Sequence, residues 1–137
     1  MSLQEIFGVE GTVALVTGAA SGLGAMFAEA MAEAGADVVC SDIDMVGLED
    51  DVTRMVDTTV AEFGRLDILF NNAGIAARIS DGAFDDLAFV KTVSDFIPLG
   101  RPAAAAEIKG AAIFLASPAS VYICGHLLVT HGGILAK

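Results

Sequence analysis

A glycine-rich segment that directly follows an apolar run is the strongest constraint on how this chain folds. Residues 13–16 are apolar, Gly18, Gly22 and Gly24 follow them, and an alanine-rich stretch with helical composition extends over residues 25–34. Glycine has no Cβ, so the main chain can turn sharply and an anion can approach it closely. A helix that begins at such a turn presents free N–H groups and the positive end of its dipole to that anion.

The segment therefore predicts a strand–loop–helix unit that binds a phosphate group. Gly18 is expected to make the turn, Gly22 to leave room for a pyrophosphate, and Gly24 to let the helix pack closely on the strand. Ser21 and Leu23 complete the loop and are expected to contact the same ligand. The alternative is an ordinary glycine-rich connection without a ligand.

An aspartate at the end of the second expected strand narrows the choice of ligand. Residues 37–41, with Val38, Val39 and Cys40 at their centre, are expected to form a second buried strand, and Asp42 ends it, 18 positions after Gly24. A carboxylate at this spacing accepts hydrogen bonds from the ribose hydroxyls of an adenosine. The same carboxylate repels a 2′-phosphate, so the sequence predicts NAD rather than NADP. A capping or loop aspartate is the alternative.

Composition and charge exclude several other functions. The 137 residues suffice for one domain with a hydrophobic core, and the longest apolar run, residues 111–116, is far shorter than the roughly 20 residues that span a bilayer. A formal net charge of −11 opposes nucleic acids and anionic membranes. The N-terminus shows no signal peptide, and two cysteines suggest neither a disulfide framework nor a metal site. We therefore expect a cytoplasmic protein in which Cys40 is buried.

The rest of the chain alternates between strand-like and helix-like patterns. Short apolar runs predict strands at residues 12–17, 37–42, 66–71 and 127–130. Composition and apolar periodicity predict helices at residues 25–34, 51–63, 84–97 and 103–117. This alternation is typical of an α/β fold with a parallel sheet.

Several motifs in order resemble the short-chain dehydrogenase/reductase family. They are the glycine loop, the position of Asp42 and the sequence Asn71-Asn72-Ala73-Gly74 after the third expected strand. Residues 97–102 and the C-terminal segment are also similar to the family, although His131 stands where the family usually has aspartate. The resemblance covers the first 75 residues and roughly the last 41. It implies a Rossmann-like three-layer sandwich, an NAD cofactor, and Asn71, Ala73 and Gly74 as further cofactor-binding residues.

The chain departs from the family where the catalytic residues are expected. In the family a tyrosine exchanges a proton with the substrate oxygen, a lysine four residues later lowers its pKa, and a serine polarises the carbonyl. The single tyrosine here, Tyr122, is followed four residues later by His126, and none of Ser80, Ser94, Ser117 and Ser120 lies at the end of an expected strand. His126 and His131 have no third metal ligand nearby in sequence. The sequence therefore identifies no catalytic residue and no metal site.

Because the chain is a little over half the family's usual length, its expected sheet is reduced. We expect a single NAD-binding Rossmann domain over residues 1–137 with strand order 2-1-3-4, in which the strand at residues 127–130 lies beside the third. The alternative is that this strand pairs with another chain. The glycine loop and residues 71–74 then meet at the carboxyl ends of the strands. An open edge of this sheet favours association, so a homo-oligomer is expected.

Three functions remain open from the sequence, and none identifies a substrate. The first is an NAD-binding domain of a short-chain dehydrogenase/reductase-type oxidoreductase that does not complete hydride transfer by the family mechanism. The second is an active NAD-dependent alcohol or ketone dehydrogenase for which segments near residues 42–51 and 75–97 are omitted from the sequence. The third is a non-enzymatic subunit that pairs with a full-length relative.

Overall fold

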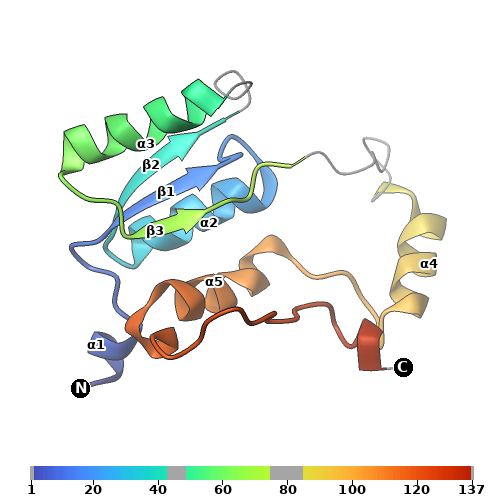
Figure 1. The fold of residues 1–137 in the computed structure, drawn as a ribbon. Helices are drawn as coiled ribbons and strands as arrows, with labels where there is room; N and C mark the ends of the chain where they lie inside the picture. Colours follow the sequence, from blue (N-terminus) through green and yellow to red (C-terminus); the bar gives the residue numbers. More distant parts are fainter. Residues whose placement is uncertain (1, 43–48, 75–84, 137) are drawn as a thin grey trace.

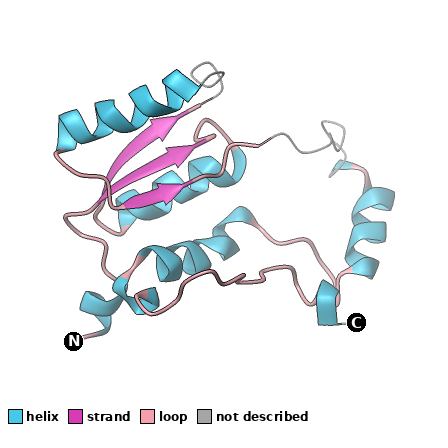
Figure 2. Cartoon of the chain, viewed as in Figure 1, coloured by secondary structure: helices cyan, strands magenta, loops and turns pink. Residues whose placement is uncertain are grey.

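A parallel three-stranded sheet forms the centre of the molecule. The computed structural model describes residues 2–42, 49–74 and 85–136. Strands β1 (Val13–Thr17), β2 (Asp37–Ser41) and β3 (Ile68–Phe70) lie in the order β2-β1-β3, side by side as Figure 2 shows. In this register Leu15 is paired with Val39 on one side and with Leu69 on the other. The predicted α/β fold with order 2-1-3 for its first three strands is confirmed.

Two helices cover opposite faces of this sheet (Figure 1). Helix α2 (Gly22–Glu33) packs against the face that carries Ala14, Val38 and Ile68. Helix α3 (Glu49–Phe63) borders a cavity with Val39 and Ser41, whose side chains point the other way because side chains alternate along a strand. The sheet between two helical layers confirms the Rossmann-like three-layer sandwich.

The remaining elements follow β3 along the chain or precede β1. Helix α1 is Leu3–Phe7, α4 is Leu87–Phe96 and α5 is Lys109–Ala116, with short 3-10 turns η3 (Ala105–Ile108), η4 (Pro118–Ser120) and η5 (Ile134–Ala136). Lys109 forms ion pairs of 2.9 Å with both Glu29 and Glu33, which hold α5 against α2. None of the helices that the structure describes is long and apolar enough to cross a membrane.

The hydrophobic core lies between the sheet and α2. Met26, Ala30 and Met31 are buried there against the β1 residue Ala14. The ring of Phe27 stacks on that of Phe70 with centroids 4.9 Å apart. Small alanine side chains let α2 lie close to the sheet, which explains why the helix is rich in alanine.

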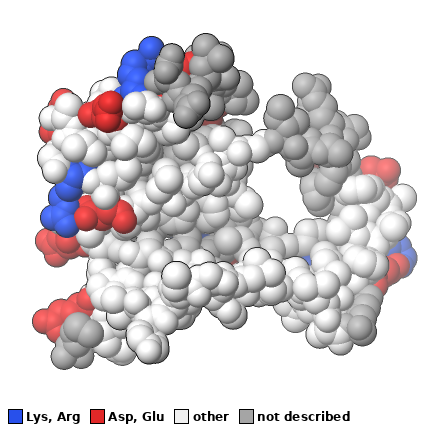
Figure 3. Space-filling view, viewed as in Figure 1, with Lys and Arg blue, Asp and Glu red and all other residues white. Residues whose placement is uncertain are grey.

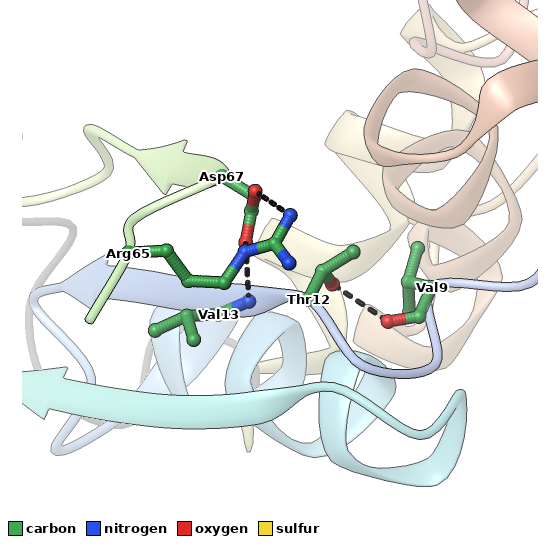
Figure 4. A network of polar contacts seen from close by, with 5 residues as sticks. All are labelled: Val9, Thr12, Val13, Arg65 and Asp67. Atoms are coloured by element: carbon green, nitrogen blue, oxygen red, sulfur yellow. Dashed lines mark hydrogen bonds and ion pairs between the residues drawn. The ribbon is translucent and has the colours of Figure 1, made fainter. Parts of the chain in front are cut away.

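A carboxylate fixes the start of β1 against the segment before β3 (Figure 4). The Oδ2 of Asp67 accepts a hydrogen bond of 2.8 Å from the main-chain N–H of Val13. Arg65 donates to both carboxylate oxygens, at 2.8 and 2.7 Å. The bond from Arg65, together with that from Val13, holds the pKa of Asp67 below its usual value. These contacts join the entry of β1 to that of β3.

The prediction of a fourth strand at residues 127–130 is wrong. These residues have no regular secondary structure, and they belong to a segment that runs along α5 in Figure 1. The ion pairs of Lys109 hold α5 against α2, and the segment that follows α5 runs along α5 rather than along β3 (Figure 1). The chain therefore does not place this segment on the edge of its own β3.

Cys40 also differs from expectation, because it is exposed. It lies on β2, which is an edge strand of the sheet, so an apolar neighbourhood in sequence does not imply burial there.

Candidate functional site

The carboxyl ends of the three strands bring the predicted binding residues to one edge of the sheet. Strand β1 leads into Gly18, β2 into Asp42 and β3 into Asn71. The main-chain N–H of Ala19 donates to the carbonyl oxygen of Ser41 at 3.1 Å, which joins the glycine loop to the end of β2. Parallel strands place ligands outside their carboxyl ends, so this edge is the candidate site.

Asp42 contacts the glycine loop directly. Its Oδ2 accepts a hydrogen bond of 2.6 Å from the main-chain N–H of Ala20, and its side chain is half-buried. A carboxylate has acceptor capacity for several hydrogen bonds, so Asp42 can hold the loop and accept from ligand hydroxyls together. The sequence did not predict the contact with Ala20.

The glycine loop has the geometry that its glycines were expected to allow. Gly18 and Gly22 have φ values of +67° and +57°, in the left-handed region that favours glycine. Gly24 is buried in the first turn of α2, where an added Cβ would lie 1.9 Å from the carbonyl oxygen of Gly18 and 2.7 Å from Nδ2 of Asn72. Helix, loop and the residues after β3 therefore meet at Gly24.

The N-terminus of α2 presents main-chain donors at this edge. Ser21 is the N-cap residue, and its side chain makes no capping hydrogen bond. Ser21, Gly22 and Leu23 are all exposed. The first N–H groups of a helix have no acceptor within the helix, and the dipole makes this end electropositive. The arrangement can bind a phosphate without a basic side chain.

Thr17 connects the glycine loop to the segment after β3, and sequence reasoning missed it. Its buried Oγ1 donates to the carbonyl oxygen of Phe70 at 3.2 Å and accepts from the N–H groups of Asn72 and Ala73 at 3.0 and 2.9 Å. The Nδ2 of Asn72 donates to the carbonyl oxygen of Thr17 at 3.0 Å. Asn71, Ala73 and Gly74 are exposed beside this network. One feature of the sequence could have indicated this role of Thr17. It is a residue with a hydroxyl group at the end of an apolar strand, directly before the first glycine.

Replacing Thr17 by valine is expected to lower the free energy of unfolding by about 1 kcal/mol, because the N–H of Ala73 loses its acceptor and the N–H of Asn72 keeps only the carbonyl oxygen of Phe70. Thr17→Ser retains the hydroxyl and is the matched control. Urea unfolding of the two variants measures the difference. A Thr17→Val variant as stable as the unmodified chain, or a larger loss in Thr17→Ser than in Thr17→Val, would contradict the role of the hydroxyl.

A cavity of about 570 Å³ adjoins Asp42 between β2 and α3. Its lining combines apolar side chains such as Met55 and Phe63 with the hydroxyl of Thr58. Ser41 also borders it, and the buried Oγ of Ser41 makes no hydrogen bond with any residue that the structure describes. The cavity offers room for a flat, partly polar group next to the carboxylate of Asp42.

Among the residues at the strand ends that the structure describes, none has the features of a proton donor for hydride transfer. Tyr122 is fully exposed in the segment after η4, and it borders a shallow pocket with His126 rather than the strand ends. Within residues 2–42, 49–74 and 85–136, no group of three histidine, cysteine or acidic residues could hold a metal ion. The hypothesis that segments are omitted from the sequence concerns residues 42–51 and 75–97. Of these, residues 43–48 and 75–84 lie outside the described residues.

Comparison with known proteins gives matches over most of the chain. A family model described as short chain dehydrogenase matches residues 42–127. Tropinone reductase-like 1 from Erythroxylum coca is 49% identical over 87 residues, which cover 49% of this chain and 32% of that protein. A (21S)-21-acetoxyl-apo-melianone synthase SDR from Melia azedarach is 36% identical over 140 aligned positions, which cover 80% of this chain and 51% of that protein. The chain thus spans between about a third and a half of these curated relatives.

A solved structure gives the same fold at lower sequence identity. A gluconate 5-dehydrogenase from Burkholderia cenocepacia, in complex with NADP and tartrate, aligns with a TM-score of 0.85 and 21% identity. The alignment covers 99% of this chain and 100% of that one. At this identity the match supports the fold alone.

Proposed function

This chain belongs to the short-chain dehydrogenase family, and from that premise we propose that residues 1–137 form a single NAD-binding Rossmann domain. The observation that carries the proposal is the meeting of three predicted segments at one edge of the sheet: the glycine loop, Asp42 and residues 71–74. Each follows the carboxyl end of a different strand, and Thr17 and Asp42 connect them by hydrogen bonds.

The binding residues divide between the parts of the cofactor. The N–H groups at the start of α2, around Ser21, Gly22 and Leu23, bind the pyrophosphate, because they supply donors and a positive dipole end. Asp42 accepts hydrogen bonds from the adenosine ribose, and the neighbouring cavity takes the adenine. Asn71, Ala73 and Gly74 border the cofactor on the opposite side of the loop. The net charge of −11 requires such short-range donors, because the molecule's field repels phosphate at a distance.

The proposed role of this chain is to bind and orient the cofactor rather than to complete hydride transfer. NAD supplies a hydride acceptor when bound, and this chemistry requires a proton acceptor at the substrate oxygen. No residue at the strand ends that the structure describes fits that task. The names of the relatives include reductases and dehydrogenases. We therefore propose an alcohol or ketone dehydrogenase activity only for a protein that also contains the family's catalytic serine, tyrosine and lysine.

Isothermal titration calorimetry with cofactor fragments tests this function. The residues assigned here contact the adenosine and pyrophosphate, so NAD and ADP-ribose should bind saturably with dissociation constants within about threefold of one another. Nicotinamide mononucleotide should not saturate at millimolar concentration. Absence of saturable NAD binding in the millimolar range would refute the function. Binding of NAD without binding of ADP-ribose would refute the residue assignment.

A further inference from the structure

The segment over residues 121–130, here termed the C-terminal extended segment, is exposed throughout and mostly apolar. Val121 and Leu127 are 87% and 78% exposed, and every residue of the segment is exposed. Across the ranges that the structure describes, residues 124–130 take part in no backbone–backbone hydrogen bond. Large apolar side chains and unpaired main-chain groups together mark a segment that gains from pairing with a strand.

Within the part of the chain that the structure describes, the outer edge of β3 also has unpaired main-chain groups, which could pair with such a segment. β3 pairs with β1 and has no second partner strand among the described residues. Its central residue, Leu69, is 54% exposed, whereas Phe70 packs toward α2. An exposed edge of this kind is a template for an added strand.

The two sequences match as neighbouring strands of a parallel sheet. β3 reads Ile68-Leu69-Phe70, and the segment contains Leu127-Leu128-Val129. Both are uninterrupted apolar runs, which is the pattern of parallel strands buried on both faces. The other edge strand, β2, fits less well, since it begins with the charged Asp37 and ends with Ser41.

Charge indicates what kind of partner meets these surfaces. No Asp, Glu, Lys or Arg occurs between residues 110 and 136 or between residues 68 and 74, in a chain with 18 Asp and Glu and 7 Lys and Arg. Figure 3 shows charged side chains toward the two sides of this view and an uncharged surface between them. A basic partner would be drawn to the acidic surfaces instead. Two copies of an acidic chain repel one another least where both surfaces are uncharged.

We propose that two copies of this chain form a dimer by exchanging residues 127–130. The exchanged run of each copy adds to the outer edge of β3 in the other copy. Each sheet then has four strands in the order 2-1-3-4, with the fourth contributed by the partner. The exchange is reciprocal, so both edges and both segments are paired in a closed two-fold dimer. This inference is independent of whether the chain binds NAD.

Analytical ultracentrifugation of variants tests the exchange. The unmodified chain should sediment as a dimer at tens of micromolar. Leu69→Lys places a charge on the β3 edge and Val129→Pro removes a main-chain donor from the segment, so each should give monomers. Leu87→Lys and Leu135→Lys, at residues 84% and 75% exposed outside both surfaces, are matched controls and should remain dimeric. Circular dichroism checks that the variants stay folded. A monomeric unmodified chain, or dimeric folded Leu69→Lys and Val129→Pro variants, would overturn the proposal.

Disulfide trapping identifies which surfaces meet. In a background of Cys40→Ser and Cys124→Ser, one copy carries Leu69→Cys and the other carries a cysteine at Leu127, Leu128 or Val129 in turn. Neighbouring strands lie about 4.8 Å apart, within the Cα separation that a disulfide spans. A mixture should give a cross-linked dimer for at least one position, and neither copy alone should. Cross-linking of the Leu128→Cys copy with itself, or none in any mixture, would overturn the exchange.

Discussion

Replacing Gly24 by alanine is expected to weaken NAD binding by on the order of ten- to a hundredfold and to lower the free energy of unfolding by about 1–3 kcal/mol. The added Cβ would lie 1.9 Å from the carbonyl oxygen of Gly18, and the nearby Nδ2 of Asn72 blocks movement in that direction. The helix and the loop must therefore separate. Separation displaces the N–H groups that we assign to the pyrophosphate.

Gly110→Ala is the matched control for this substitution. Gly110 also lies in the first turn of a helix, α5, but nothing lies within 4 Å of the Cβ that alanine would add. Alanine favours a helix over glycine, so the variant should be unchanged or up to about 1 kcal/mol more stable and should bind NAD normally. Calorimetry and urea unfolding measure both effects. Equal NAD affinity in the two variants would contradict the role of Gly24.

The strand–loop–helix unit could be predicted because its determinants are local. Residues 13–16 are apolar on both faces because β1 is the central strand, and all five residues of β1 are buried. The glycines that follow are needed where the main chain has positive φ or where a Cβ would collide, and both requirements concern neighbouring residues. The approximate range of α3 could be predicted for the same reason, because Gly64, with positive φ, directly follows its last residue, Phe63.

Features that depend on distant parts of the chain could not be predicted in the same way. The residues from 127 to 130 have the composition of a strand, but whether they pair depends on where α5 holds the chain, and thus on Lys109 with Glu29 and Glu33. The role of Thr17 likewise depends on main-chain groups more than 50 residues away. Such contacts leave no periodic pattern in the sequence.

Asp42→Ala is expected to weaken NAD binding by about ten- to a hundredfold while NADP binding stays the same or improves. Loss of NAD affinity follows from the lost charge-assisted hydrogen bonds to the ribose, and each such bond contributes about 1.5–3 kcal/mol. NADP gains because the carboxylate no longer repels the 2′-phosphate. Removal of Asp42 also frees the N–H of Ala20, and this disturbance of the loop affects both cofactors alike.

The ratio of the two dissociation constants therefore isolates the ribose interaction from the loop contact. Asp42→Asn is the matched control, because its amide oxygen can still accept from Ala20 while the charge is lost. We expect the ratio of the NADP to the NAD dissociation constant to fall in both variants, and absolute NAD affinity to fall further in Asp42→Ala. Calorimetric titration with each cofactor gives these values. An unchanged ratio in both variants would assign Asp42 to the support of the glycine loop alone, and the preference for NAD would then need another origin.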